Sequence, residues 1–92
     1  MTKEEFELEI AEGTVMVDFY ATWCGQCKLL GPVLDYVVED TGVKLVKIDV
    51  DEVDWIEGMD VEKLPTVIIY KNGVEKTRFS GYKRKQAILE ML

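Results

Sequence analysis

Two cysteines separated by two residues are the most reactive feature of this sequence. They are Cys24 and Cys27 in the stretch TWCGQCK, residues 22–28, and the chain has no other cysteine and no histidine. The stretch follows an apolar run and opens a helical pattern, which places the pair one turn apart at a helix N-terminus. Cα atoms at this spacing are roughly 5–6 Å apart, within the range of about 4.4–6.8 Å that a disulfide spans. The pair can therefore form and open a disulfide without movement of the fold.

The same position distinguishes the two thiols. The thiolate is the reactive form of cysteine, and the unpaired amides and positive dipole end of a helix N-terminus favour negative charge. This effect is strongest for the first cysteine of the pair. We expect Cys24 to be the nucleophile and Cys27 to be the resolving thiol.

Three other roles for the cysteines deserve comparison. A structural disulfide would be unusual in a reducing cytosol, and so short a loop restricts the unfolded chain little. A closed zinc site takes four ligands, so two thiolates without imidazole would need a second subunit or carboxylates to complete it. Two inert buried thiols would not require this spacing at a strand-to-helix junction. The pattern favours redox exchange over all three.

Composition and charge limit the partners of the chain. Its 92 residues suffice for one modest core, and we expect residues 1–92 to form a single domain. Eleven basic and eighteen acidic residues leave a formal charge of −7, which disfavours nucleic acid or an anionic membrane as a partner. The apolar runs are far shorter than the ~18 residues of a membrane helix, and residues 1–13 lack the apolar core of a signal peptide. We therefore expect a cytoplasmic protein.

Charge is also unevenly distributed along the chain. Acidic residues dominate positions 1–12 and 49–62, whereas basic residues crowd positions 71–85. The basic stretch is either a solvated face or a docking surface for an acidic partner, and the sequence leaves both interpretations open.

Hydrophobic spacing predicts the elements that lead to the cysteines. Thr2 and Glu5 form a capping-box pattern, which indicates a short helix that ends before Gly13. Residues 14–20, TVMVDFY, are apolar on both faces except at Asp18. A strand covered on both sides has this pattern, so we expect 14–20 to be a central strand.

A long helix and a second strand should follow the cysteines. The helical pattern runs from Cys24 to Gly42, with a kink expected at Pro32, and residues 43–49 have the pattern of a strand. A strand, a helix and another strand form a right-handed crossover. Strands 14–20 and 43–49 should therefore be parallel.

The second half of the chain predicts a hairpin between two helices. A short, poorly patterned helix is expected at about 52–59, and Asn72-Gly73 between two β-rich runs indicates a tight hairpin. Residues 82–92 carry apolar side chains on one face, as a closing amphipathic helix does. The predicted order is αβαβαββα, an α/β fold with a mixed four-stranded sheet and helices on both faces.

As a series, these segments resemble the thioredoxin family. A CxxC motif alone would be weak evidence, but the series covers nearly the whole chain in the family's order. It comprises VDFYATWCGQCK (17–28), Gly31-Pro32, KID (47–49), LPT (64–66), KNG (71–73) and Gly81. The resemblance implies the thioredoxin fold and a protein disulfide reductase, in which Cys24 attacks a substrate disulfide and Cys27 releases the mixed disulfide. It implies no metal and no cofactor besides the cysteine pair.

The resemblance also implies where substrates bind. Pro65 would be cis and face the cysteines, and the backbone at Leu64 would pair with an extended substrate segment. Gly81 would leave room for the substrate beside Leu64, although a glycine there can also simply end a strand. The residues expected to contact substrates are Trp23, Gly25, Gln26, Leu64, Pro65 and Gly81.

Three further residues match functional positions of the family. Asp18 matches its buried aspartate, which would accept the proton of Cys27; apolar neighbours disfavour the alternative of a solvated strand-end carboxylate. Lys47 matches the lysine beside that aspartate, and it could equally protect an edge strand. Trp23 matches the tryptophan beside the active site, and its place in a loop favours an exposed recognition surface over a core position.

The chain departs from the family pattern in three ways. Gln26 stands between the cysteines where proline is usual, and Tyr20 replaces the more common tryptophan. About a dozen residues precede strand 14–20, so the usual first strand is missing and strand 43–49 becomes an edge. Lys44 and Lys47 on that edge would discourage association, and we expect a monomer.

Two other functions remain compatible with the sequence. A glutaredoxin-like enzyme would bind glutathione, but Trp23 and Lys28 belong to the thioredoxin pattern. A non-enzymatic subunit of a larger complex could use the same fold. As an enzyme, the chain would take protein disulfides as substrates and receive electrons from thioredoxin reductase or another disulfide reductase.

Overall fold

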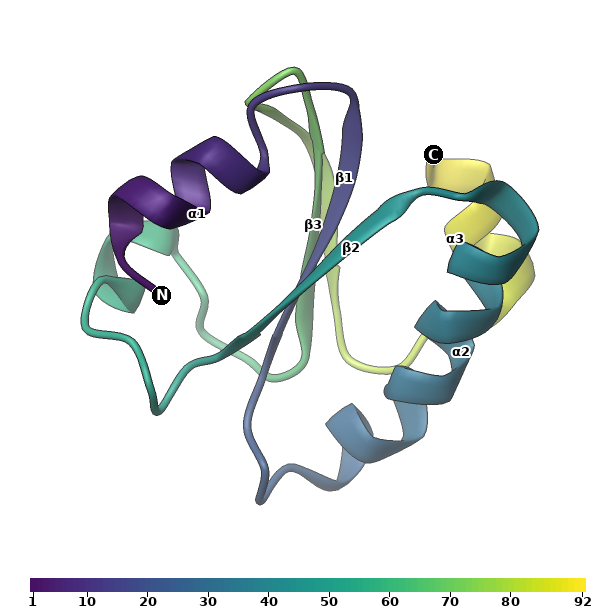
Figure 1. Cartoon of the computed structure of the whole chain (residues 1–92). Helices are drawn as coiled ribbons and strands as arrows, with labels where there is room; N and C mark the ends of the chain where they lie inside the picture. Colours follow the sequence, from purple (N-terminus) through teal and green to yellow (C-terminus); the bar gives the residue numbers. More distant parts are fainter.

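A computed structural model describes residues 1–92, and Figure 1 shows the path of the chain. The order of elements agrees with the predicted αβαβαββα, with a 3₁₀ turn in place of the third helix. In chain order they are α1 (Lys3–Glu9), β1 (Thr14–Tyr20), α2 (Gly25–Thr41), β2 (Lys44–Asp49), the 3₁₀ turn η1 (Ile56–Met59), β3 (Thr66–Lys71), β4 (Val74–Ser80) and α3 (Lys85–Met91).

The helix expected at about 52–59 is wrong in its extent, because only η1 forms there. Asp49 Oδ1 accepts a bond from the Asp51 N–H at 3.0 Å, and the Asp49 carbonyl accepts one from the Glu52 N–H at 3.0 Å. These bonds close a tight turn where a first helical turn was expected. Trp55, which precedes η1, also provides no side-chain cap. One 3₁₀ turn is all that this stretch supports.

The four strands form one mixed sheet in the order β2-β1-β3-β4. β1 pairs with β2 in parallel, as the crossover predicted, and with β3 in antiparallel. β3 and β4 form the predicted hairpin, and its turn residues Asn72 and Gly73 have φ values of 52° and 84°. An Asn-Gly pair adopts such left-handed conformations readily. β2 lies at one edge of the sheet, as expected for a chain whose first strand is 14–20.

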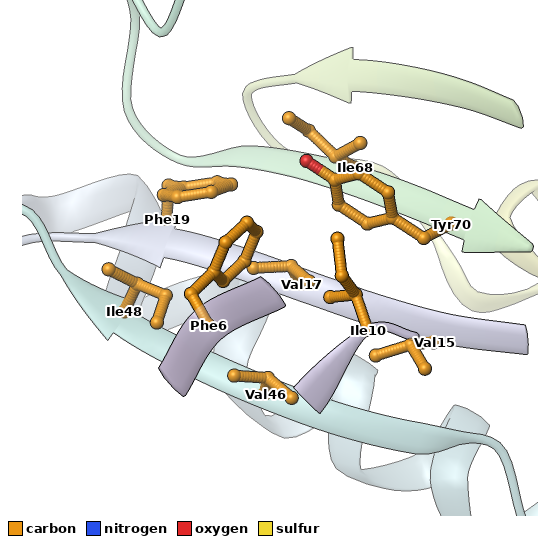
Figure 2. Packing of buried hydrophobic residues seen from close by; sticks show 9 residues of the cluster. All are labelled: Phe6, Ile10, Val15, Val17, Phe19, Val46, Ile48, Ile68 and Tyr70. Carbon is orange, nitrogen blue, oxygen red and sulfur yellow. The ribbon is translucent and has the colours of Figure 1, made fainter. Parts of the chain in front are cut away.

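One face of the sheet is covered by α1. Figure 2 shows Phe6 of this helix among side chains of β1, β2 and β3. The centroid of the Phe6 ring lies 6.2 Å from that of Phe19 and 5.8 Å from that of Tyr70, distances at which aromatic rings attract. The predicted capping box is present, because the Thr2 N–H donates to Glu5 Oε1 and the Glu5 N–H donates to Thr2 Oγ1. This short helix is thus held at its start and by its buried ring.

The opposite face is covered by α2 and α3 (Figure 1). α2 contributes Leu30 and Leu34 to this layer, where they pack with Met16 of β1 and Ile88 of α3. Strand alternation places Asp18 on the same face as Met16, so a carboxyl group enters an otherwise apolar layer. None of the helices has the length and hydrophobicity that crossing a membrane requires.

The topology gathers four chain segments at one end of the sheet. Antiparallel pairing sets Phe19, near the end of β1, opposite Thr66 at the start of β3. Thr66 in turn lies opposite Ser80 at the end of β4. α2 begins shortly after β1 at this same end (Figure 1). Segments far apart in the sequence therefore meet around the cysteines.

Candidate functional site

The cysteine pair lies at the start of α2. Cys24 is the N-cap residue, and its sulfur forms a disulfide with that of Cys27, with the Cα atoms 5.3 Å apart. The Cys27 N–H also donates to Cys24 Sγ at 3.2 Å. Both residues are more than nine-tenths buried. A helix amide directed at Cys24 Sγ favours negative charge on that sulfur.

A loop before β3 and the end of β4 lie beside the cysteines. The Leu64-Pro65 peptide bond is cis, as the family resemblance implied, and Leu64 packs against the cluster that contains Cys24 and Cys27. The Gly81 N–H donates to the Pro65 carbonyl at 2.8 Å. Gly81 has a φ of +81°, in the left-handed region that favours glycine. These expected substrate residues are therefore brought to one place.

Gln26 extends from the motif toward Gly81. A Cβ atom placed on Gly81 would lie 3.2 Å from Gln26 Oε1, closer than an ordinary contact. Gly25 and Gln26 are both exposed in the first turn of α2. The sequence predicted that Gln26 and Gly81 face the substrate, but it contained no signal that the two residues lie next to each other.

Trp23 is exposed beside the cysteines, as expected, with 70% of its surface open. Its indole Nε1–H donates to Asp51 Oδ2 at 2.8 Å, which restrains the ring. The sequence analysis missed Asp51, because nothing distinguished it from the other carboxylates of residues 49–62.

A groove of about 400 Å³ lies beside Cys24. Its walls come from the motif loop and from the segment between β2 and β3. The apolar residues that line it are Trp23, Val50, Ile56, Val61 and Leu64. Cys24 borders this groove whereas Cys27 does not, so the two sulfurs have different surroundings.

Asp18 is buried, as its apolar neighbours predicted, with only 3% of its surface exposed. Its Oδ1 atom has no hydrogen-bond partner. Burial raises the pKa of Asp18 to about 6; the charge of Lys47 opposes this rise and that of Asp35 adds to it. This carboxyl group therefore changes its protonation close to neutral pH.

A second cavity, of about 370 Å³, borders both Asp18 and Cys27. Lys47 also lines this cavity and lies opposite Asp18 in the pairing of β1 with β2. The Nζ atom of Lys47 is 3.9 Å from Asp35 Oδ1. Lys47 thus sits both beside the aspartate and on an edge strand, so the two expectations for it are compatible. The sequence analysis missed Asp35, although its spacing of eight residues from Cys27 places both on one helix face. No three thiol or carboxylate groups gather where they could hold a metal ion.

Comparison with known proteins identifies the family. A family model described as thioredoxin matches residues 1–92. The chain belongs to the thioredoxin family. Thioredoxin of Listeria monocytogenes is 40% identical over 95 residues, covering 100% of this chain and 92% of the relative. Thioredoxin of Bacillus subtilis is 39% identical over 94 residues, covering 99% of this chain and 90% of the relative.

Solved thioredoxin structures share this fold. A mutant thioredoxin from Halobacterium salinarum has a TM-score of 0.91 at 29% identity, covering 99% of this chain and 82% of that one. Plasmodium falciparum thioredoxin has a TM-score of 0.87 at 32% identity, covering 98% of this chain and 90% of that one. The predicted thioredoxin fold is confirmed.

Family membership and the cysteine pair together determine the class of activity. The chain is a thiol–disulfide oxidoreductase, a protein disulfide reductase of the thioredoxin family. Thioredoxins act on disulfides, receive electrons from a reductase partner and generally carry no cofactor. The geometry of this site allows the steps to be assigned to particular residues.

Proposed function

We propose that the chain reduces protein disulfides by two consecutive thiol–disulfide exchanges. In the reduced chain, the Cys24 thiolate attacks one sulfur of the substrate disulfide, forms a mixed disulfide and displaces the other substrate sulfur. The Cys27 thiolate then attacks Cys24 Sγ, which closes the Cys24–Cys27 disulfide and displaces the second substrate sulfur. Two electrons pass to the substrate, and the protons lost by the cysteines are matched by those that the two substrate thiolates take up.

The surroundings of Cys24 carry this assignment. Cys24 caps α2, accepts the Cys27 N–H at 3.2 Å and borders the groove. Cys27 lies in the first turn of the helix and borders the cavity shared with Asp18. A substrate lying in the groove meets the sulfur of Cys24 first.

Asp18 is the proposed acceptor of the Cys27 proton. Because its pKa is about 6, the carboxylate is largely ionised at pH 7 and still basic enough to take up a proton. The cavity that borders both residues provides the path between them. Lys47, on the rim of this cavity, favours the ionised and accepting form of Asp18.

The substrate segment lies across the end of the sheet. The backbone at Leu64, before the first residue of β3, offers hydrogen bonds to an extended segment, in the manner of an added strand. Trp23 forms one wall of the groove, and the bond from the Gly81 N–H to the carbonyl of the buried Pro65 fixes the loop beside it. Gly25 and Gln26 complete the surface from the first turn of α2.

The expected partners follow from the exchange chemistry. Each cycle leaves the cysteines oxidised, so a disulfide reductase such as thioredoxin reductase must return them to thiols. The cysteine pair carries both electrons, and the proposed reaction uses no other cofactor. We place this activity in the cytoplasm, where thiols are kept reduced, and in a monomer consisting of one thioredoxin-like domain.

Serine variants test the order of attack. Cys24→Ser is expected to abolish reduction of the insulin disulfides, because no thiolate then faces the substrate. Cys27→Ser is expected to complete the first exchange and accumulate mixed disulfides, whose linkage mass spectrometry identifies. Linkage through Cys27 in the Cys24→Ser variant, at the rate of the parent chain, would reverse the assignment. Replacement of both cysteines with serine should abolish insulin reduction, whereas a non-enzymatic subunit role would survive it. A reduced parent chain that leaves the insulin disulfides intact would overturn the enzymatic proposal.

A further inference from the structure

We infer that the groove beside Cys24 selects disulfides whose flanking segment carries an apolar and a basic side chain. This inference rests on the proposed reductase function and specifies its substrate class. The preference for an apolar side chain follows from the groove walls, because Val50, Ile56 and Val61 can bury such a side chain away from water. The preference for a basic side chain follows from the acidic residues at the rim of the groove.

The charged residues that line the groove are both acidic. They are Asp51 and Glu62. They belong to a segment, residues 49–62, that holds seven carboxylates and no basic residue. None of the seven forms an ion pair; the four ion pairs of the molecule lie elsewhere. Asp51 and Glu62 therefore have no ion-pair partner within the chain, and a basic side chain of a partner would supply one.

Trp23 provides a specific contact for such a cation. Its ring is largely exposed, and its Nε1–H is held by the Asp51 carboxylate. A lysine or arginine of the substrate can lie over the ring face and approach Asp51 at the same time, which combines a cation–π contact with an ion pair. Trp23 thus belongs to the apolar wall and also lies beside Asp51 of the acidic rim, so one substrate side chain can contact both.

The groove exists before a substrate arrives, because Arg78 of β4 holds its outer wall. The guanidinium donates to the Met59 carbonyl at 3.3 Å from both Nη atoms, and Nη1 donates to the Asp60 carbonyl at 3.0 Å. Ile56 and Val61, which line the groove, lie on either side of these carbonyls. A preformed groove discriminates between side chains without the entropic cost of ordering a loop.

Matched peptide disulfides test the inference. We would prepare two disulfide-linked peptides that both carry leucine beside the cysteine and differ only in a neighbouring lysine or glutamate. The reduced chain is mixed with each peptide, and the single-turnover rate constant is followed by chromatography of the released thiols. The lysine peptide is expected to react roughly five to ten times faster at low ionic strength, as one or two exposed charge contacts allow, and the ratio should shrink at high salt.

Variants separate the rim from the net charge of the chain. Glu62→Gln is expected to lower the lysine-to-glutamate ratio about twofold or more. Glu39→Gln removes the same charge from an exposed position of α2, roughly 20 Å along the helix from Cys24, and should leave the ratio unchanged. Equal rates for both peptides, or equal effects of the two variants, would overturn the inference while leaving the reductase function intact. If neither peptide is reduced, the proposed function fails with it.

Discussion

At the scale of single residues, the buried carboxylate of Asp18 is the proposed proton acceptor for Cys27, and its burial lowers the free energy of unfolding at neutral pH. Folding raises its pKa from 3.8 to about 6, so the folded chain binds this proton more tightly than the unfolded chain does. The contribution of Asp18 to the free energy of unfolding is therefore greatest below pH 4. It falls as the pH rises to 6 and beyond, by on the order of 3 kcal/mol in total.

Asp18→Asn should consequently give a more stable but slower protein. Because asparagine carries no charge to bury, the free energy of unfolding at pH 7 is expected to rise by roughly 1–3 kcal/mol. The decrease in this free energy that Asp18 causes between pH 4 and 7 should also disappear. Urea denaturation at several pH values measures this, with Glu39→Gln as a control at an exposed carboxylate. Insulin reduction at pH 7 should slow, because Cys27 loses its proton acceptor. A variant that is less stable and fully active would contradict both assignments.

Gln26 stands where the resemblance to the family leads one to expect proline. Proline has no N–H, whereas Gln26 keeps a first-turn amide that no helix carbonyl accepts and that can stabilise a thiolate. A more stable reduced form makes a stronger oxidant, so Gln26→Pro should make the redox potential more negative by roughly 20 mV, the equivalent of one net hydrogen bond. Gln26→Ala, which keeps the backbone N–H, should shift the potential less. Equilibration with glutathione buffers measures both, and an unchanged or less negative value for the proline variant would refute the argument.

The part of the site that could be predicted is the part encoded locally or by resemblance. The expected roles of Cys24 and Cys27 follow from their positions in one helix turn. The burial of Asp18 follows from its apolar neighbours in a single strand. Asp51 and Asp35 escaped prediction because their importance depends on partners 28 and 12 positions away, Trp23 and Lys47. A carboxylate among many gives no local sign that an indole or an ammonium group lies beside it.

At the scale of elements, β4 supports a segment that has little structure of its own. Arg78 donates to the backbone carbonyls of Met59 and Asp60 at the end of η1 and is itself paired with Glu75 at 2.7 and 2.8 Å. One 3₁₀ turn cannot hold the wall of a groove by its own hydrogen bonds, so a side chain from a neighbouring strand supplies them. Residues 52–59 take their conformation from tertiary contacts such as those of Arg78. A local sequence pattern therefore did not predict the structure of this segment.

Arg78→Met tests this supporting role. The variant keeps most of the apolar stem but loses the donors, so the KM for insulin is expected to rise several-fold while reduction of a small aromatic disulfide, which does not fill the groove, stays unchanged. The free energy of unfolding should fall by roughly 1–3 kcal/mol. Lys76→Met, at an exposed position of the same strand, is the matched control. Equal losses with both substrates would show that Arg78 serves overall stability and not the groove.

At the scale of the whole molecule, the sheet and its faces were predictable because each depends on a simple periodicity. Residues 14–20 alternate between two covered faces, the crossover through α2 dictates a parallel partner, and Asn72-Gly73 dictates a hairpin. The pairing of β1 with β3 was not encoded by any local pattern. The sequence analysis placed all four strands in one sheet but did not predict which strands of the two halves pair.

That pairing divides the reaction centre between two halves of the chain. The cysteines belong to the β1-α2-β2 half, whereas Leu64, Pro65 and Gly81 belong to the β3-β4 half, and the pairing of β1 with β3 joins the two halves into one sheet. The spacing of the sulfurs is set within one helix turn and does not depend on this contact. Opening the sheet between β1 and β3 would therefore separate two properties that the native protein combines: the capacity to exchange electrons would stay with the first half, and the choice of which disulfide receives them would be lost.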